Sequence, residues 1–164
     1  MTIVTVRPVI DSDIPGFAAI SAVPDVLRLG AFEVVTAGDA TFEAAWQRLR
    51  AEKSKVIRTA EANGDVIGYV LAYDTGLRFP PLDYTLDGTR FGPGIAADAF
   101  RAFLTGFPRR PVRVWVAAAN LQAIDVLESL SFARIDRRDA ADSATGVDRI
   151  EFLYELTFLA GFGR

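Results

Sequence analysis

The stretch Phe91-Gly92-Pro93-Gly94-Ile95-Ala96 decides the fold, because it joins a strand to a helix through a glycine-rich turn. The strand-like run Leu82–Leu86 precedes it, and an amphipathic segment at residues 95–107 follows. Glycines let the backbone approach an anion closely, and the free N–H groups of a helix N-terminus point toward that anion. These features indicate a pyrophosphate site, and an ordinary turn is the alternative.

A second patterned segment is Asn120-Leu121-Gln122-Ala123-Ile124-Asp125-Val126-Leu127-Glu128-Ser129-Leu130-Ser131-Phe132. Together with the glycine turn, it resembles the acetyl-CoA-binding half of GNAT-fold N-acetyltransferases. The similarity is greatest with the branch that acetylates the N-termini of ribosomal proteins (the Rim type). In that branch the loop has the pattern Trp-Gly-x-Gly-x-Ala, and the later helix has Asn-x-x-Ala-x-x-x-Leu-Glu-x-Leu-Gly-Phe.

Composition restricts the chemistry that the chain can perform. Its 164 residues, of which 51% are hydrophobic, predict one folded domain that spans residues 1–164. The chain has no cysteine and no histidine. These absences exclude disulfides, thiolate sites and histidine bases, and they leave no metal site to expect. Any catalysis must use carboxylates, hydroxyl groups or the backbone.

Charge and hydropathy point away from nucleic acid and membrane partners. The net charge is −3, and the basic and acidic residues are interspersed. The basic cluster at residues 109–113 is interpreted as a solvated loop before a strand, or as a neighbour of CoA phosphates. The N-terminus lacks the pattern of a signal peptide, and no apolar run reaches the length of a membrane span. We therefore expect a cytoplasmic protein.

The expected fold class is α/β, with a mixed sheet (α+β) and helices on both faces. The turn at Asn63-Gly64-Asp65 predicts a hairpin, which a doubly wound fold would not contain here. The expected order is β-α-α-β-β-β-α-β-α-β-β, which is the order of the GNAT fold. We expect strands at residues 3–6, 55–62, 66–73, 82–86, 111–117, 132–136 and 150–158, and helices near residues 13–20, 41–49, 95–107 and 120–130. We expect a loop or a broken helix at 30–38 and a loop at 139–148.

The resemblance implies where a cofactor would bind. The strands Leu82–Leu86 and Val112–Ala117 would splay apart, and the pantetheine arm would enter the gap and pair with the first of them. The diphosphate would bind the backbone amides of residues 92–97. The residues implied in cofactor binding are Thr85, Leu86, Phe91, Gly92, Pro93, Gly94, Ile95, Ala96, Ala97, Asn120 and Leu127.

Several positions depart from the family pattern or admit a second interpretation. Pro93 has no N–H to donate, although proline suits the first turn of a helix. Phe91 could pack in the core under the loop, and Asn120 could serve only as a helix cap. Leu127 stands where many members have a tyrosine acid. Ser131 replaces a common glycine, so a positive φ there would cost about 1 kcal/mol.

The implied reaction is direct attack by a neutral amine on a thioester, with the amide near Thr85 or Leu86 as the donor to the oxyanion. A base must first remove the ammonium proton. Without histidine, the candidates are Asp83, Tyr84, Asp74, Glu33 and Glu151, and for each acid a solvated surface carboxylate is the alternative. Adjacent residues of a strand face opposite ways, and we expect Tyr84 to face the substrate.

The sequence thus predicts an acetyl-CoA-dependent N-acetyltransferase acting on a primary amine, either a peptide N-terminus or a small molecule. The amine is expected to contact the first two helices and the loops at 74–81 and 139–148. A GNAT-fold module that binds CoA without catalysis, or serves as an interaction domain, is the main alternative. A different nucleotide-binding α/β protein is the third. The apolar region at residues 152–158 and Phe162 could support a homodimer.

Overall fold

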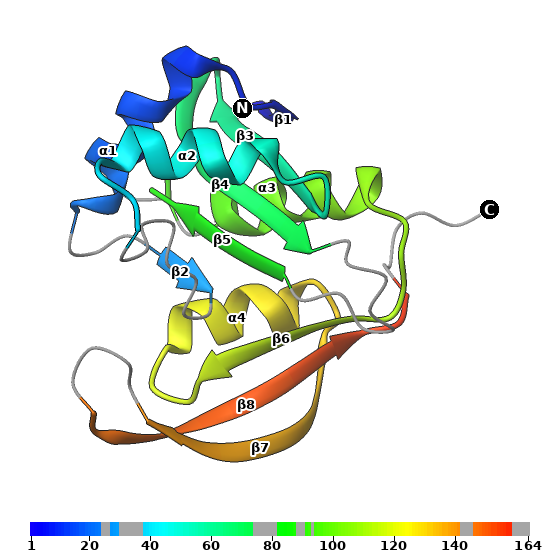
Figure 1. Ribbon diagram of the computed structural model, residues 1–164. Helices are drawn as coiled ribbons and strands as arrows, with labels where there is room; N and C mark the ends of the chain where they lie inside the picture. Colours follow the sequence, from blue (N-terminus) through cyan, green and yellow to red (C-terminus); the bar gives the residue numbers. More distant parts are fainter. Residues whose placement is uncertain are drawn as a thin grey trace.

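The computed structural model describes residues 1–23, 27–29, 38–73, 82–87, 91–92, 94–141 and 146–158. Its elements, in chain order, are β1 (Val4–Pro8), a 3-10 turn (Asp11–Asp13), α1 (Ile14–Ser21), β2 (Leu27–Leu29), α2 (Phe42–Ala51), β3 (Lys55–Ala62), β4 (Asp65–Tyr73), β5 (Leu82–Leu86), α3 (Gly94–Gly106), β6 (Val112–Ala117), α4 (Leu121–Ser129), β7 (Ala133–Ala141) and β8 (Asp148–Leu156) (Figure 1).

The strands form two separate sheets. One has five strands in the order β1-β3-β4-β5-β2, and the other has three in the order β6-β8-β7. The pairs that hold each sheet together are antiparallel. The expected α/β class with helices on both faces is confirmed.

Helices cover the five-stranded sheet on both faces. On one face, α1 and α2 enclose a cluster centred on Phe17, Trp46 and Tyr69. On the other face, α3 and α4 enclose a larger cluster that includes Phe100 and Leu127. Within the described ranges, no strand pairing connects the two sheets. This larger cluster also contains buried residues of β6 and β8, so packed side chains connect them.

The central elements form where the sequence predicts them. The hairpin between β3 and β4 turns at Asn63 and Gly64, whose φ values are 52° and 88°. Such a turn requires positive φ at both central residues, which Asn-Gly tolerates. Asn63 also ties down the N-terminus, because it exchanges two 2.8 Å hydrogen bonds with the backbone of Ile3.

One expectation about a loop is wrong. The expected loop at 139–148 is shorter, because β7 continues to Ala141 and β8 already starts at Asp148. The side chains of β7 are nearly all exposed, so the strand shows no apolar alternation from which it could be predicted. The sequence also assigns no element to residues 27–29, where the structure has β2. Residues 30–37 of the expected loop or broken helix lie outside the described residues.

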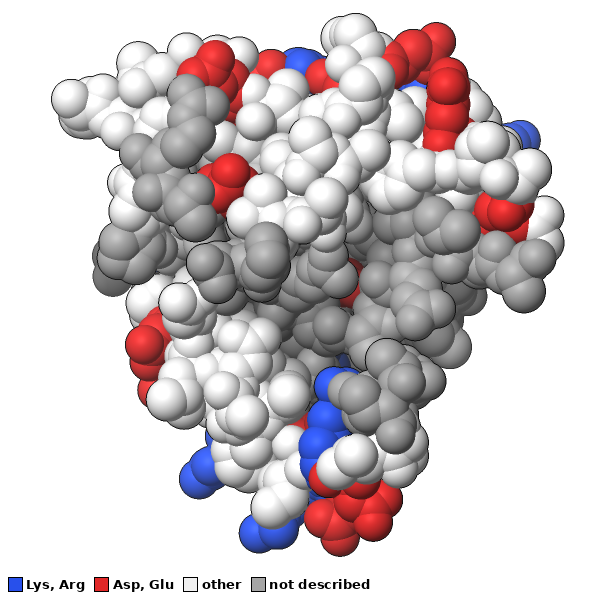
Figure 2. All heavy atoms as spheres, turned by 90° about the vertical axis from the view of Figure 1, so that its left-hand side faces the viewer, with Lys and Arg blue, Asp and Glu red and all other residues white. Residues whose placement is uncertain are grey.

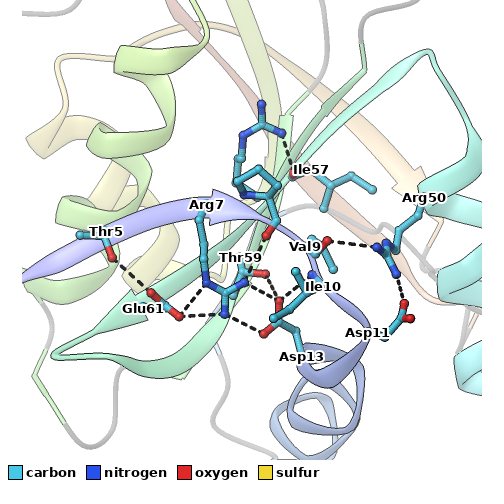
Figure 3. A network of polar contacts seen from close by, with 12 residues as sticks. Thr5, Arg7, Val9, Ile10, Asp11, Asp13, Arg50, Ile57, Thr59 and Glu61 are labelled. Atoms are coloured by element: carbon cyan, nitrogen blue, oxygen red, sulfur yellow. Dashed lines mark hydrogen bonds and ion pairs between the residues drawn. The ribbon is translucent and has the colours of Figure 1, made fainter.

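A buried ionic network fastens the start of the chain to the sheet (Figure 3). Arg7 of β1 donates to both carboxylate oxygens of Asp13 at 2.7 and 2.8 Å, and to Glu61 of β3 at 2.8 Å. Asp13 also accepts from the Thr59 hydroxyl at 2.7 Å and from the Ile10 N–H at 3.0 Å. The network therefore joins β1, the 3-10 turn and β3 through one carboxylate.

The surroundings of Asp13 determine its titration. Burial acts to raise the pKa of Asp13, but the hydrogen bonds from Arg7, Ile10 and Thr59 outweigh it and lower the pKa to about 2. Because the folded pKa lies below the unfolded value of about 3.9, the stabilisation is complete above pH 4 or so. It is lost as the pH falls through about 2.

We expect Asp13→Asn to lower the free energy of unfolding by about 3 kcal/mol at neutral pH, because Arg7 would lose its buried partner. Urea denaturation at pH 7, 4 and 2 measures this loss. The free energy of unfolding of the variant should also fall less steeply between pH 4 and pH 2 than that of the unaltered protein. Asp11→Asn is the control, since Asp11 lies at the surface beside Arg50 and should cost much less. Equal losses from both variants would contradict the assignment.

Candidate functional site

The candidate site lies where the sheet divides between two strands, β5 and β6. In the chain, β5 comes before α3 and β6 comes after it, but the two strands belong to different sheets. Figure 1 shows β6 leaving the region of β5 and running along the three-stranded sheet. The expected splaying of Leu82–Leu86 and Val112–Ala117 is therefore present in the fold.

The glycine turn presents open space at the start of α3. The helix begins at Gly94, and Gly92 has a φ of 86°. Among the described residues, apart from immediate neighbours in the chain, none has an atom within 4 Å of a Cβ added at Gly92 or at Gly94. The N-terminal amides of a helix attract anions, so this end has both the room and the donors for a diphosphate.

The residues around this turn have different surroundings. Ile95 and Ala96 are buried, whereas Gly94 is exposed and Ala97 is partly exposed. Phe91 packs against the cluster under α3, which confirms the interpretation of this residue as core packing. Pro93 lies outside the described residues.

The second motif forms α4 as predicted. The Asn120 side chain accepts a 3.2 Å hydrogen bond from the Ala123 N–H, so the role as helix cap is confirmed. Leu127 is fully buried in the core cluster. Ser131 has a φ of 70°, and the N–H groups of Ser131 and Phe132 bond back to the carbonyls of Glu128 and Leu127 at 3.0 Å. Serine thus takes the left-handed position that glycine usually fills at a helix end.

β5 has two faces with different chemistry. Tyr84 lies opposite Val70 and packs against Phe100 of α3, with ring centroids 5.3 Å apart. It is fully buried, and its hydroxyl has no hydrogen-bond partner among the described residues. Burial, and secondarily the charge of Asp83, raise the pKa of Tyr84 well above its usual range. The expectation that Tyr84 faces the substrate side is therefore wrong, because this face is closed by α3.

Asp83 points to the opposite face. It lies opposite Leu71, which belongs to the cluster under α1 and α2, and only 7% of it is exposed. Its carboxylate accepts a 2.8 Å hydrogen bond from the Tyr84 N–H. Burial and then the Asp83 charge raise the pKa of Tyr73 to about 12, which indicates that the two groups are close. Thr85, two residues further along β5, is on the same face as Asp83 and lies opposite Tyr69.

The other candidate bases are less suited or lie outside the described residues. Glu151 of β8 is 5% exposed and accepts hydrogen bonds from Arg138 at 2.8 Å and Arg149 at 2.7 Å. Burial acts to raise the pKa of Glu151, but these hydrogen bonds lower it overall. A carboxylate held by two guanidinium groups is a poor proton acceptor. Asp74 and Glu33 fall outside the described residues.

The basic side chains near Glu151 do not form a patch of one sign. Figure 2 shows that Lys and Arg side chains on this face lie mostly in its lower part, beside acidic side chains. Arg138 also stacks over the Trp115 ring, with the guanidinium carbon 4.0 Å from the ring centroid. Arg113 of β6 pairs with Glu155 of β8 at 2.7 Å. The three-stranded sheet thus carries a largely self-neutralised surface.

Sequence reasoning missed two features of β5. The first is β2, which pairs with β5 along its edge, so that Leu27 lies opposite Leu86 and Leu29 opposite Tyr84. The second is Gly68 of β4, which has a φ of 141° and lies so close to β5 that an added Cβ would be 2.0 Å from the Thr85 oxygen. An isolated glycine in a strand is a known signal for such a close approach. Three alternating residues are too few to predict β2.

This fold defines a class of protein: a domain whose sheet is split between the two strands on either side of one helix, α3. The family model described as an acetyltransferase (GNAT) domain matches residues 4–133. The chain therefore belongs to the GNAT acetyltransferase family. Acetyltransferases of this family use acetyl-CoA to acetylate amines. No curated protein matches the chain in sequence.

Solved structures share this fold at low sequence identity. A variant of spermidine N-acetyltransferase SpeG from Vibrio cholerae matches with a TM-score of 0.74 and 13% identity, covering 94% of this chain and 93% of that one. RimJ from Mycobacterium smegmatis in complex with CoA-disulfide matches at 0.71 and 18%, covering 94% and 81%. Ribosomal-protein-alanine N-acetyltransferase from Brucella melitensis matches at 0.68 and 14%, covering 93% and 99%.

Among the described residues, no group of three or more histidine, cysteine, aspartate or glutamate side chains could hold a metal ion. No helix in the described part of the chain has the length and apolar character needed to span a membrane.

The geometry at Ser131 predicts a stabilising substitution. Ser131→Gly should relieve about 1–2 kcal/mol of backbone strain and cost about 0.5–1 kcal/mol in unfolded-chain entropy. We expect a net gain of about 0.5–1 kcal/mol in the free energy of unfolding, measured by urea denaturation. Ser129→Gly, inside α4, is the matched control and should destabilise. A loss of stability in Ser131→Gly would contradict the strain.

Proposed function

We propose that this acetyltransferase moves the acetyl group of acetyl-CoA directly to a primary amine. The observation that supports this most is the split between β5 and β6, with the open N-terminus of α3 beside it. Acetyl-CoA would supply an activated acyl thioester. The chain would supply position, backbone donors and a proton acceptor.

The cofactor site that we propose consists mainly of backbone. The N–H groups of residues 94–97 at the start of α3 would bind the diphosphate, and Gly92 would allow its close approach. The Thr85 carbonyl faces β4, so of the two candidate donors the backbone of Leu86 would orient the thioester end and donate to its carbonyl oxygen. This arrangement needs no histidine and no metal ion, which agrees with the composition of the chain.

We propose Asp83 as the proton acceptor for the attacking amine. Among the candidate bases in the described residues, Asp83 is the carboxylate on β5 that faces α1 and α2, opposite the side covered by α3. An alkylammonium has a pKa of about 10.4, so a group near the thioester must take its proton, directly or through one water.

The acceptor would be a polyamine, a peptide N-terminus or another small amine. The structural neighbours named for spermidine and for ribosomal-protein alanine support this range, since both are primary amines. A single domain over residues 1–164, a cytoplasmic location and a homodimer stay predictions from the sequence.

A second candidate function is an interaction module of the same fold that transfers no acetyl group. One observation favours it: β2 pairs with the edge of β5 that the cofactor arm would need. Turnover separates the two, because such a module would release no CoA with any amine.

We expect acetyl-CoA to raise the melting temperature of the protein, and Gly94→Leu to abolish this rise by filling the space for the diphosphate. Gly106→Leu is the matched control, because Gly106 ends the same helix and its added Cβ also meets nothing within 4 Å. The control should keep the full shift. A shift that persists in Gly94→Leu would show that the anion binds elsewhere.

We expect Asp83→Asn to lower kcat by about 100-fold or more with the best amine of a panel, while the Kd for acetyl-CoA stays unchanged. Asparagine keeps an oxygen acceptor for the Tyr84 N–H, so the strand should hold its shape. Tyr84→Phe is the control and should keep kcat within a few-fold, because its hydroxyl points toward α3. A kcat that Asp83→Asn leaves unchanged would remove Asp83 as the base.

A further inference from the structure

β2 occupies an edge of β5 that the proposed function assigns to the cofactor. In the register between them, Leu27 lies opposite Leu86, Arg28 opposite Thr85, and Leu29 opposite Tyr84. On its other edge, β5 pairs with β4 through the same three residues. Both edges of residues 84–86 are therefore filled by the chain itself.

An edge of a strand has one row of N–H and C=O groups and can pair with one neighbour. Adjacent strands lie about 4.8 Å apart, so a second extended chain has no space on an edge that is already paired. Adjacent residues of a strand direct these groups to opposite edges, and the Thr85 carbonyl faces β4. The cofactor arm contains amides and would use the row on the β2 edge at Leu86. The arm and β2 therefore exclude one another.

We propose that β2 is a built-in competitor of the cofactor arm, which must displace Leu27–Leu29 from β5 to bind. This inference rests on the proposed function, in which the arm pairs with β5. The diphosphate end needs only the start of α3, where space is open, so the nucleotide part of the cofactor would bind without moving β2.

The size of β2 suits a displaceable segment. It has three residues, whereas an ordinary strand has about five or six, so it contributes few backbone hydrogen bonds. The bound arm would replace those bonds on β5, while β2 would pair with water. Because the two sets of hydrogen bonds are similar, the free-energy difference between the β2-paired and the arm-paired state is modest. Either state can therefore be the more populated one.

A reversible cross-link tests the competition. The chain has no cysteine, so the double variant Arg28→Cys/Thr85→Cys contains one possible disulfide. Directly opposed residues of antiparallel strands have Cα atoms about 4.5–5.5 Å apart, which suits a disulfide. Asp139→Cys/Ile150→Cys is the matched control, because it links opposed residues of β7 and β8 away from β5.

Two probes separate the arm from the nucleotide. Desulfo-CoA has the complete arm and no thiol that could open the disulfide, and 3′-phospho-ADP has the nucleotide and both phosphates of the diphosphate without the arm. Calorimetry gives the Kd of each probe for the oxidised and reduced forms of both double variants.

We expect oxidation of Arg28→Cys/Thr85→Cys to weaken desulfo-CoA by about tenfold or more, because the competent state is no longer populated. Reduction should restore the affinity, and 3′-phospho-ADP should bind both forms equally. Unchanged binding of desulfo-CoA by the oxidised form would overturn the inference, as would an equal loss of both probes. Failure of both probes to bind any form would instead overturn the proposed function.

Hydrogen exchange provides a second test on the unaltered protein. Desulfo-CoA should speed exchange in a peptide containing Leu27–Leu29, while a peptide containing Leu82–Leu86 stays protected by the arm. With 3′-phospho-ADP, neither peptide should change. Protection of Leu27–Leu29 that persists at saturating desulfo-CoA would contradict the displacement.

Discussion

The structure depends on the pairing of the backbone of β5. A buried strand must find partners for its N–H and C=O groups, and β5 has lost β6 as a neighbour because the sheet divides between them. β4 serves one edge, and β2 serves residues 84–86 of the other. The cofactor arm that we propose would use this same edge. The edge proposed for the cofactor is thus also the edge that the folded chain must satisfy when no cofactor is bound.

Side chains hold together what the divided sheet does not. The cluster under α3 and α4 takes residues from both sheets, among them Tyr84 of β5, Val114 of β6 and Tyr154 of β8. At the far edge, the Arg7 and Asp13 network fixes β1 to β3. Packed side chains therefore connect the two sheets across the split, and hydrogen-bonded ion pairs fix the far edge of the larger sheet.

Much of the fold could be predicted because its signals are local. Asn63-Gly64 specified a hairpin, the apolar run of β4 indicated a strand covered on both faces, and the spacing of Phe100 and Phe103 indicated α3. The site was predictable only in part. Alternation showed that Asp83 and Tyr84 face opposite ways, but which face α3 covers depends on contacts far along the chain. The sequence predicts this strand only to residue 136, whereas β7 continues to Ala141, because an exposed strand carries no apolar pattern. The Thr59–Asp13 bond spans 46 positions, which no local pattern reveals.

The cluster shared by the two sheets has a mechanical consequence. Side-chain packing, and not a ladder of hydrogen bonds, sets the position of the three-stranded sheet relative to the other sheet. Phe100 and Phe132, whose rings stack with centroids 5.9 Å apart, contribute to this packing. Because interiors are close-packed, a change of one methylene in this cluster would shift the two sheets relative to one another.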